Sequence, residues 1–315
     1  MHLSCARRAD RRRLPRQRVA CVLLLALAAL RAHAQDIEPR AYSNAPVGVN
    51  FAIAGAVWTR GGLPSDPAIP VTDASLRTSN LVLAYARALD LWGKSGKFDA
   101  IVPYTRLDGS ADYLGQPLER RIAGFGAPAF RLSINLYGAP ALALRDFANW
   151  KQNVIVGASL QVVPPWGQYD ATRLVNISSH RWAIKPELGL SKAVGAWTLE
   201  LQAAMTFFAD NDRFFGSNTR SQRPLYALQG HLIHAFPSGK WISFDTTYFT
   251  GGRSSIDDVA SDDLQRNWRA GVVFAIPVDR LDSFKLSASS GVSARTGNNF
   301  DAIGIAWQHR WGGGL

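Results

Sequence analysis

Lysine and glutamate occur two residues apart inside an otherwise apolar stretch of this sequence. In RWAIKPELGLSK (181–192), Lys185 and Glu187 alternate with apolar side chains. Residues two apart on a β-strand point to the same face, so this spacing places an ammonium group beside a carboxylate. Such a pair can brace a protein interior, or it can line the path of a polar solute. Both readings stay open from the sequence alone.

Other stretches with the same alternation supply more polar residues on the face opposite the apolar one. Of the charged residues on this face, Lys185 and Glu187 included, five are basic and four are acidic. This near balance predicts crossed ion pairs in an interior, and not a ring of charges of one sign that selects an ion. We expect the following residues to line a lumen or substrate path: Asp99, Arg131, Lys185, Glu187, Glu200, Gln229, His231, Asp245, Arg269, Lys285 and Arg310.

Enzymatic chemistry has little support in the sequence. Both cysteines, Cys5 and Cys21, lie near the N-terminus, and the G-x-S-x-G, H-E-x-x-H and Cys/His zinc spacings do not occur. His234 with Ser243 is the one pairing that could serve a barrel hydrolase whose serine and histidine face lipid. We therefore expect no enzyme, no cofactor and no metal site, with an outer-membrane hydrolase as an alternative.

The first 34 residues are typical of a secretory signal peptide. An arginine-rich start is followed by the apolar run VACVLLLALAAL (19–30) and by Ala32-His33-Ala34, so cleavage is expected after Ala34. This segment holds eight of the 35 basic residues and one of the 24 acidic ones, so the formal charge of +11 falls to about +4 for residues 35–315. The basic balance thus reflects export and gives no reason to expect a nucleic-acid partner.

Residues 35–315 repeat a strand pattern to their end. In WTLELQAAMTFF (197–208), apolar residues alternate with Glu200, Gln202 and Thr206. Twelve such segments are bounded by Gly, Pro, Asn or Asp. They are expected at 48–59, 76–89, 97–106, 124–136, 152–163, 181–192, 197–208, 224–236, 241–249, 265–277, 283–294 and 300–311.

The connections between these segments alternate in length. Tight turns at 90–97, 193–196, 237–240 and 277–282 are separated by long polar loops at 60–75, 107–123, 164–180, 209–223 and 250–264. Short periplasmic turns and long extracellular loops, with aromatic residues at strand ends, are typical of outer-membrane barrels. The exception, 137–151, is long at the short-turn end, and its apolar spacing suggests a short amphipathic helix. The fold predicted is all-β: a transmembrane antiparallel β-barrel of about twelve strands, preferred over a soluble sandwich.

Three local features refine this barrel. The loop 164–180 contains the stiff or aromatic residues Pro165, Trp166 and Tyr169 beside Asp170, so we expect it to constrict the extracellular mouth. Residues 35–46, which precede the first strand, are too few for a substantial plug in the lumen. Pro186 lacks the N–H that a strand position uses, so a local break in the ladder is expected there.

Several of these segments resemble one family of outer-membrane proteins, named for the meta-cleavage pathway of phenol degradation. The resemblance rests on PPWGQYDATRLVNISSHRWAIKPELGLSK (164–192), ADNDRFFG (209–216), HLIHAF (231–236), GKWISFDTTYFTGG (239–252) and IAWQHRWGGG (305–314). It implies a barrel and uptake of small, including aromatic, compounds. The chain departs from the family pattern at Ala127, where an acidic residue is expected, and at Ser178 and His180.

The sequence therefore predicts a protein of the cell outer membrane that passes small organic solutes. Its expected partners are those solutes, the bilayer with its lipopolysaccharide, and the barrel-assembly machinery. The alternatives are the hydrolase and a structural or adhesive barrel that transports nothing.

Overall fold

The fold was described from a computed structural model, which covers residues 38–62, 71–113, 116–173, 175–296 and 299–315. Strands dominate it, and one short helix, α2 (Leu144–Phe147), lies among them. The barrel strands are β1 (Val49–Gly62), β2 (Val71–Leu91), β3 (Lys94–Tyr113), β5 (Ala129–Tyr137), β6 (Val154–Val163), β7 (Ala183–Val194), β8 (Trp197–Phe208), β11 (Leu225–Ala235), β12 (Trp241–Gly251), β15 (Gln265–Pro277), β16 (Asp282–Ala294) and β17 (Phe300–Gly312). No helix in this part of the chain is long and apolar enough to cross a bilayer.

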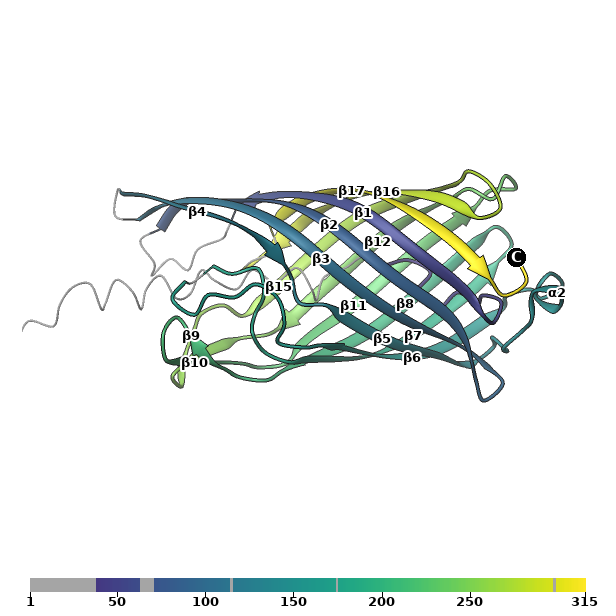
Figure 1. The fold of residues 1–315 in the computed structure, drawn as a ribbon, viewed down its shortest axis with the longest axis horizontal. Helices are drawn as coiled ribbons and strands as arrows, with labels where there is room; N and C mark the ends of the chain where they lie inside the picture. The colour runs from purple at the N-terminus through teal and green to yellow at the C-terminus, as the bar shows by residue number, and fades with distance from the viewer. Residues whose placement is uncertain (1–37, 63–70, 114–115, 174, 297–298) are drawn as a thin grey trace, which may run out of the picture.

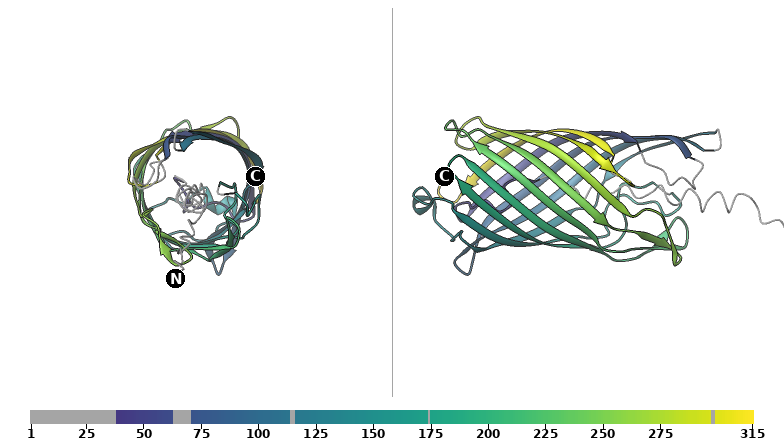
Figure 2. Two further views of the ribbon diagram at one scale, coloured as in Figure 1. Left: turned by 90° about the vertical axis from the view of Figure 1, so that its left-hand side faces the viewer. Right: turned by 180° about the vertical axis from the view of Figure 1, so that it is seen from behind.

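These twelve strands close into an antiparallel barrel. Each pairs with its neighbour in sequence, β1 pairs with β17, and the order therefore returns to its start. The strands tilt steeply around a common axis (Figure 1), and the end-on view shows a closed ring (Figure 2). Closure leaves no free sheet edge, which a strand inside lipid could not tolerate. The predicted fold class is confirmed.

The two faces of the wall separate apolar from polar side chains as the alternation predicts. On β8, Trp197, Leu199 and Leu201 are exposed on the outside, whereas Glu200 and Gln202 are buried within. In lipid an outward leucine has no reason to be covered, so exposed apolar side chains around the barrel mark the bilayer-facing surface. The inner face carries the polar residues and forms the lumen.

Strand positions follow the sequence closely in the barrel and differ outside it. The predicted segments 197–208 and 265–277 coincide with β8 and β15. The segment 107–123, expected as a polar loop, instead continues β3 and forms β4 (Gln116–Phe125), apart from residues 114–115, which are not described. Exposed charged side chains, among them Arg106, Asp108, Glu119 and Arg121, stand along this hairpin, so it lacks the apolar alternation that marks a membrane strand.

Strands β4 and β5 share one place in the wall. Both pair with β3, β4 with its outer half and β5 with its inner half, and residues 126–128 interrupt them. The loop 164–182 covers this break: the Gln168 N–H donates to the Phe125 carbonyl at 2.7 Å, and the Gln168 side chain packs where Gly124 has no Cβ. Ala127, the position that departs from the family pattern, lies buried at the break.

The two ends of the barrel differ in the way the loop lengths predict. One end carries β4 and a small four-stranded sheet of β9 (Asn211–Phe214), β10 (Asn218–Gln222), β13 (Ser254–Ile256) and β14 (Val259–Ala260). The other end carries the tight turns, α2 and the C-terminus (Figure 1). The expected helix within 137–151 is present, and its Phe147 stacks on Trp150 with ring centroids 5.7 Å apart. The expected signal peptide, 1–34, lies outside the described residues.

Candidate functional site

The segment of residues 38–48 lies inside the periplasmic half of the lumen; we call it the N-terminal segment. Its side chains and backbone contact inward-facing residues of β3, β5, β7, β8 and β12. It leaves the lumen where the Val47 N–H donates to the Leu142 carbonyl. These few residues do not form a substantial plug, but they enter the lumen as a single extended segment, because an extended chain needs few residues to cross a narrow barrel.

Glu38 completes an ion-pair chain on one wall of the lumen. The Arg131 guanidinium donates to both carboxylate oxygens of Glu38, at 2.7 and 2.9 Å, and through Nε to Asp99 at 3.0 Å. Burial alone would raise the pKa of Glu38, but Arg131 and Lys97 outweigh burial and hold that pKa well below its ordinary value. The pairing predicted within the lumen exists, and the N-terminal segment supplies one of its acids.

Arg40 reaches a second part of the wall. Its backbone N–H donates to Glu200 at 2.7 Å, and its guanidinium lies 5.5 Å from the centre of the Trp241 ring. Lys285 approaches the same ring, at 5.9 Å. Ser191 donates to the second oxygen of Glu200 at 3.0 Å. The tryptophan face thus attracts two cations, while Glu200 fixes the path of the backbone.

Tyr42 anchors the segment between two glycines. Its hydroxyl donates to Glu187 at 3.0 Å, and Lys185 pairs with the same carboxylate at 3.7 Å. A Cβ added at Gly157 or Gly189 would lie 2.2 or 2.1 Å from Tyr42 ring carbons. Glycine at these two strand positions therefore makes room for the ring. Glu187 consequently binds both Tyr42 of the segment and Lys185 of the wall.

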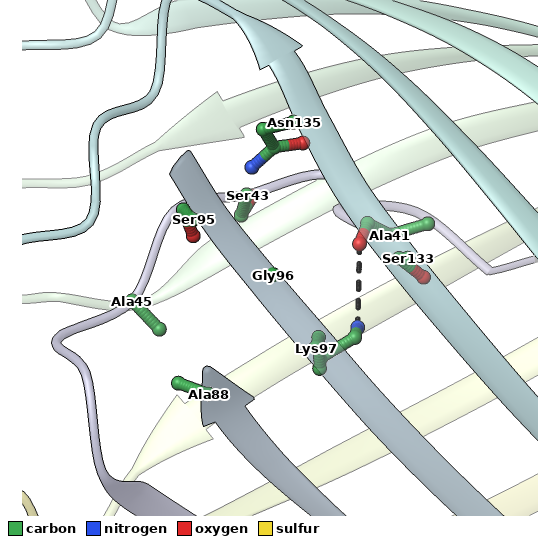
Figure 3. A pocket seen from close by; sticks show the side chains of 9 residues that line it. All are labelled: Ala41, Ser43, Ala45, Ala88, Ser95, Gly96, Lys97, Ser133 and Asn135. Carbon is green, nitrogen blue, oxygen red and sulfur yellow. Dashed lines mark hydrogen bonds between the residues drawn. The ribbon is translucent and has the colours of Figure 1, made fainter. Parts of the chain in front are cut away.

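A small pocket remains between the N-terminal segment and the wall (Figure 3). The Lys97 ammonium group donates to the Ala41 carbonyl at 3.2 Å across one side of it, and Asn135 donates to the Tyr42 carbonyl at 3.2 Å. The pocket is lined by Ala41, Ser43, Ala45, Ala88, Ser95, Gly96, Lys97, Ser133 and Asn135. These contacts tie the backbone of the segment to β3 and β5.

The other residues expected in the lumen fall into separate groups. His231 and Asp245 meet on adjacent strands: Nδ1 lies 2.7 Å from a carboxylate oxygen, and Ser243 donates to the other oxygen at 2.8 Å. Gln229 is buried two residues before His231 on β11. Arg269 lies in register with Gln229 on the far side of β12, with its guanidinium 3.8 Å from the centre of the Phe300 ring. Arg310 lies at the periplasmic rim, where it donates to the Arg280 carbonyl in the β15–β16 turn.

The residues named for a hydrolase do not meet. Ser243 faces the lumen and is fully buried, whereas the His234 ring belongs to the outward face of β11 and lies 4.4 Å from the Trp197 ring. Ser243 donates to Asp245 and not to a histidine. A nucleophile needs direct contact with its base, so this arrangement differs from a catalytic triad.

The predicted mouth loop divides between the two surfaces of the barrel. Trp166 is exposed and lies edge-on to Phe130, an outward-facing residue, with ring centroids 6.3 Å apart. It therefore covers the outer wall and does not narrow the mouth. Tyr169 stacks on His180 at 4.7 Å, and its hydroxyl accepts from Asn211 at 2.8 Å. Hydrogen bonds from the Thr172 hydroxyl and N–H hold the pKa of Asp170 below its ordinary value.

The extracellular end contains two buried arginines that are absent from the residues expected to line the lumen. Arg181 lies over the Phe208 ring at 4.3 Å and donates to Gln222. Arg220 lies over Phe214 at 5.2 Å and pairs with Asp263 at 3.8 Å. Arg181 begins the predicted segment 181–192 and shares the parity of Lys185, but the strand itself starts only at Ala183. Arg220 lies in the short strand β10, where a period of two is too brief to indicate which way a side chain points. Among the described residues, no group of histidine, cysteine or carboxylate side chains could hold a metal ion.

Comparison with known proteins agrees with this architecture. The model of the family described as "Putative MetA-pathway of phenol degradation" matches residues 64–308. No curated protein matches the sequence. The solved COG4313 outer membrane channel from Pseudomonas putida F1 is similar at a TM-score of 0.75 with 18% identity, over 88% of this chain and 100% of that one.

Two further solved barrels are more distant. The KdgM porin gives a TM-score of 0.46 with 9% identity, over 82% of this chain and 98% of that one. The CymD monoaromatic hydrocarbon channel gives 0.44 with 6% identity, over 85% and 89%. The family match covers most of the chain, and the barrel has the lipid-facing wall that an outer membrane requires. The protein is an outer-membrane β-barrel that belongs to the family described as "Putative MetA-pathway of phenol degradation".

Proposed function

We propose that this protein is a channel through which small organic solutes, aromatic compounds included, cross the outer membrane without being chemically changed. The observation that carries the proposal is a closed barrel whose apolar face is outside and whose polar face surrounds an interior crossed by one thin segment. The apolar outer face thus suits contact with lipid, while the polar inner face offers hydrogen-bonding groups to a solute. The name of the similar solved barrel, an outer membrane channel, and the family description support the same role.

The N-terminal segment sets the width of this passage in our proposal. It is held by side chains and not by strand pairing: Arg131 binds Glu38, Glu200 binds the Arg40 backbone and Glu187 binds Tyr42. Contacts of this kind can break singly, whereas a strand of the wall cannot leave without opening the barrel. The segment therefore restricts flow to small molecules in the periplasmic half.

The remaining parts of the proposal concern how the barrel reaches its place. We infer that residues 1–34 direct export, that the barrel-assembly machinery inserts the chain, and that the loop end faces lipopolysaccharide. The arginine-rich start followed by an apolar run supports the first of these. The separation of long loops and tight turns between the two ends supports the last.

Liposome swelling tests the proposed function. Liposomes containing the purified, refolded barrel are placed in isotonic solutions of uncharged solutes of increasing size. We expect swelling with small solutes and none with solutes too large for the lumen. Absence of swelling with every solute, in samples whose barrel is shown to be folded by its heat-dependent gel mobility, would instead favour a structural or adhesive barrel.

A further inference from the structure

Three lumen side chains in one row across the wall each carry a buried polar atom without a hydrogen-bond partner in the described part of the chain. Gln202 on β8 lies opposite Gln229 on β11, and Gln229 lies opposite Thr247 on β12. All three are buried and point inward, since their neighbours Leu201 and Leu228 are exposed outside. Gln202 Nε2, Gln229 Oε1 and Thr247 Oγ1 have no partner among the described residues. Buried polar atoms of native proteins are nearly always paired, so these atoms call for a ligand or for water.

His231 adds a fourth unused atom beside this row. It follows Gln229 by two residues on β11 and so shares its face. Nδ1 lies 2.7 Å from Asp245, which also accepts from Ser243, so the carboxylate fixes the proton on Nδ1. Nε2 therefore points away from this carboxylate, and it is buried with no partner in the described part of the chain. It accepts a hydrogen bond in the neutral imidazole and donates one in the imidazolium.

The four atoms are close enough to meet one small molecule. Residues directly opposite on antiparallel strands have Cβ atoms about 5 Å apart, and diagonal neighbours about 7 Å apart. The row therefore spans about 10 Å, which is comparable with one aromatic ring and its substituent. It lies near the middle of β8, β11 and β12, at the depth of the bilayer core.

The chemistry of the unused atoms selects an uncharged polar ligand. The nearby carboxylates are already engaged: Glu200 accepts from Ser191 and from the Arg40 backbone, and Asp245 accepts from His231 and Ser243. Arg269 lies opposite Thr247 at the end of the row, but its guanidinium donates to the Phe300 carbonyl and the Ser289 hydroxyl and lies over the Phe300 ring. An anionic ligand among the four atoms would therefore meet the Glu200 and Asp245 carboxylates at close range, which disfavours it. A hydrocarbon would leave all four polar atoms unpaired. A hydroxyl group donates once and accepts as well, so it can satisfy a glutamine oxygen or the imidazole together with a glutamine N–H.

We propose that Gln202, Gln229, Thr247 and His231 form a hydrogen-bonding station in the lumen that binds uncharged, hydroxyl-bearing solutes on their way through the barrel. The inference rests on the proposed channel function and adds to it the substrate class. In this arrangement the solute hydroxyl donates to Gln229 and accepts from Gln202, and His231 and Thr247 take either role.

Saturation-transfer NMR on the refolded barrel in detergent tests the station without requiring conduction. Benzyl alcohol, toluene and benzoate serve as probes, since the first two differ by one hydroxyl and the third carries a charge. The station variants are Gln229→Met and Thr247→Val, which remove the polar atoms at nearly constant volume. Gln161→Met is the matched control, because Gln161 lies on β6, which β7 separates from β8, and so stands outside the row.

We expect each station variant to weaken binding of benzyl alcohol by about two- to tenfold, the worth of one hydrogen bond, and to leave toluene unchanged. Gln161→Met should behave as the wild type, and subtracting the variant signal removes partitioning into detergent. Equal benzyl alcohol binding in wild type and both folded variants would overturn the station and leave water as the partner of these atoms. Because swelling of liposomes is measured separately, loss of the station and loss of the channel are distinguishable.

Discussion

At the scale of single residues, the contact between Glu38 and Arg131 decides how firmly the N-terminal segment is held. Arg131 also pairs with Asp99, so it keeps one partner when Glu38 is lost. We predict that Glu38→Gln loosens the segment by about 1 kcal/mol, after allowance for the partial exposure of Glu38. Single-channel recording should then show larger or more frequent current fluctuations. Glu119→Gln is the control, since Glu119 is exposed on β4 and pairs with Arg121. Identical traces for both variants would contradict a role for Glu38.

The lowered pKa of Glu38 gives the same contact a defined dependence on pH. A carboxyl group whose pKa is lower in the folded state than in the unfolded state stabilises the folded state at any pH above its ordinary pKa. This contribution is lost as the pH falls through the pKa of the folded state. Arg131 and Lys97 hold the pKa of Glu38 well below its ordinary value. We therefore expect the conductance pattern to be constant between about pH 8 and pH 5, in the range above that ordinary value. A transition within this range that disappears in Glu38→Gln would show that the ion pair is weaker than described.

The position of the Tyr42 ring determines which glycines of the wall can be replaced by alanine without a clash. A Cβ at Gly189 would lie 2.1 Å from the ring, whereas one at Gly230 has its nearest neighbour at 3.5 Å. We predict that Gly189→Ala opens the channel to larger solutes in the swelling assay, and that Gly230→Ala does not. The effect of Gly189→Ala should vanish in a Tyr42→Ala background, because the clash is then absent. An effect that persists without the Tyr42 ring would place its cause in the strand itself.

At the scale of elements, Pro186 interrupts the pairing of β7 with β8. The register runs from Ile184 opposite Phe207 to Glu187 opposite Ala204 and skips the two positions between. This matches the sequence expectation, since proline has no N–H to donate. We predict that Pro186→Val restores a bond inside the bilayer and raises the free energy of unfolding by about 1 kcal/mol. Urea unfolding in liposomes, followed by tryptophan fluorescence, measures it. A lower stability would mean that the bend at Pro186 is required.

The sequence predicted the membrane strands well because each faces two solvents. Alternation is forced wherever one side meets lipid and the other the lumen, so WTLELQAAMTFF (197–208) reads as a strand without ambiguity. The hairpin of β3 and β4 escaped prediction because exposed charged side chains replace the apolar ones along it. The site was harder: strand parity placed Arg131 and Glu187 inward, but their partners Glu38 and Tyr42 come from a segment with no periodicity. Contacts over such sequence separations follow from the closed barrel and from no local pattern.

At the scale of the whole molecule, the protein combines a closed wall with one segment that lies inside it. The wall is a continuous hydrogen-bonded cylinder, whereas the N-terminal segment is fixed by a few side-chain contacts in its periplasmic half. In the channel that we propose, this division lets the width of the passage change without exposing strand edges to lipid. The chemistry of the interior then determines which solutes pass.

Single-channel recording in planar bilayers tests this account most directly. Residues 35–315, here the mature chain, are compared with a variant of it that lacks residues 38–44. The variant keeps Val47 and its bond to Leu142, so the rim of the barrel stays intact. The account predicts a small stepwise conductance for the mature chain and a clearly larger one for the deletion variant. Absence of conductance from both, when both are folded and inserted, would contradict the claim that this barrel is a channel.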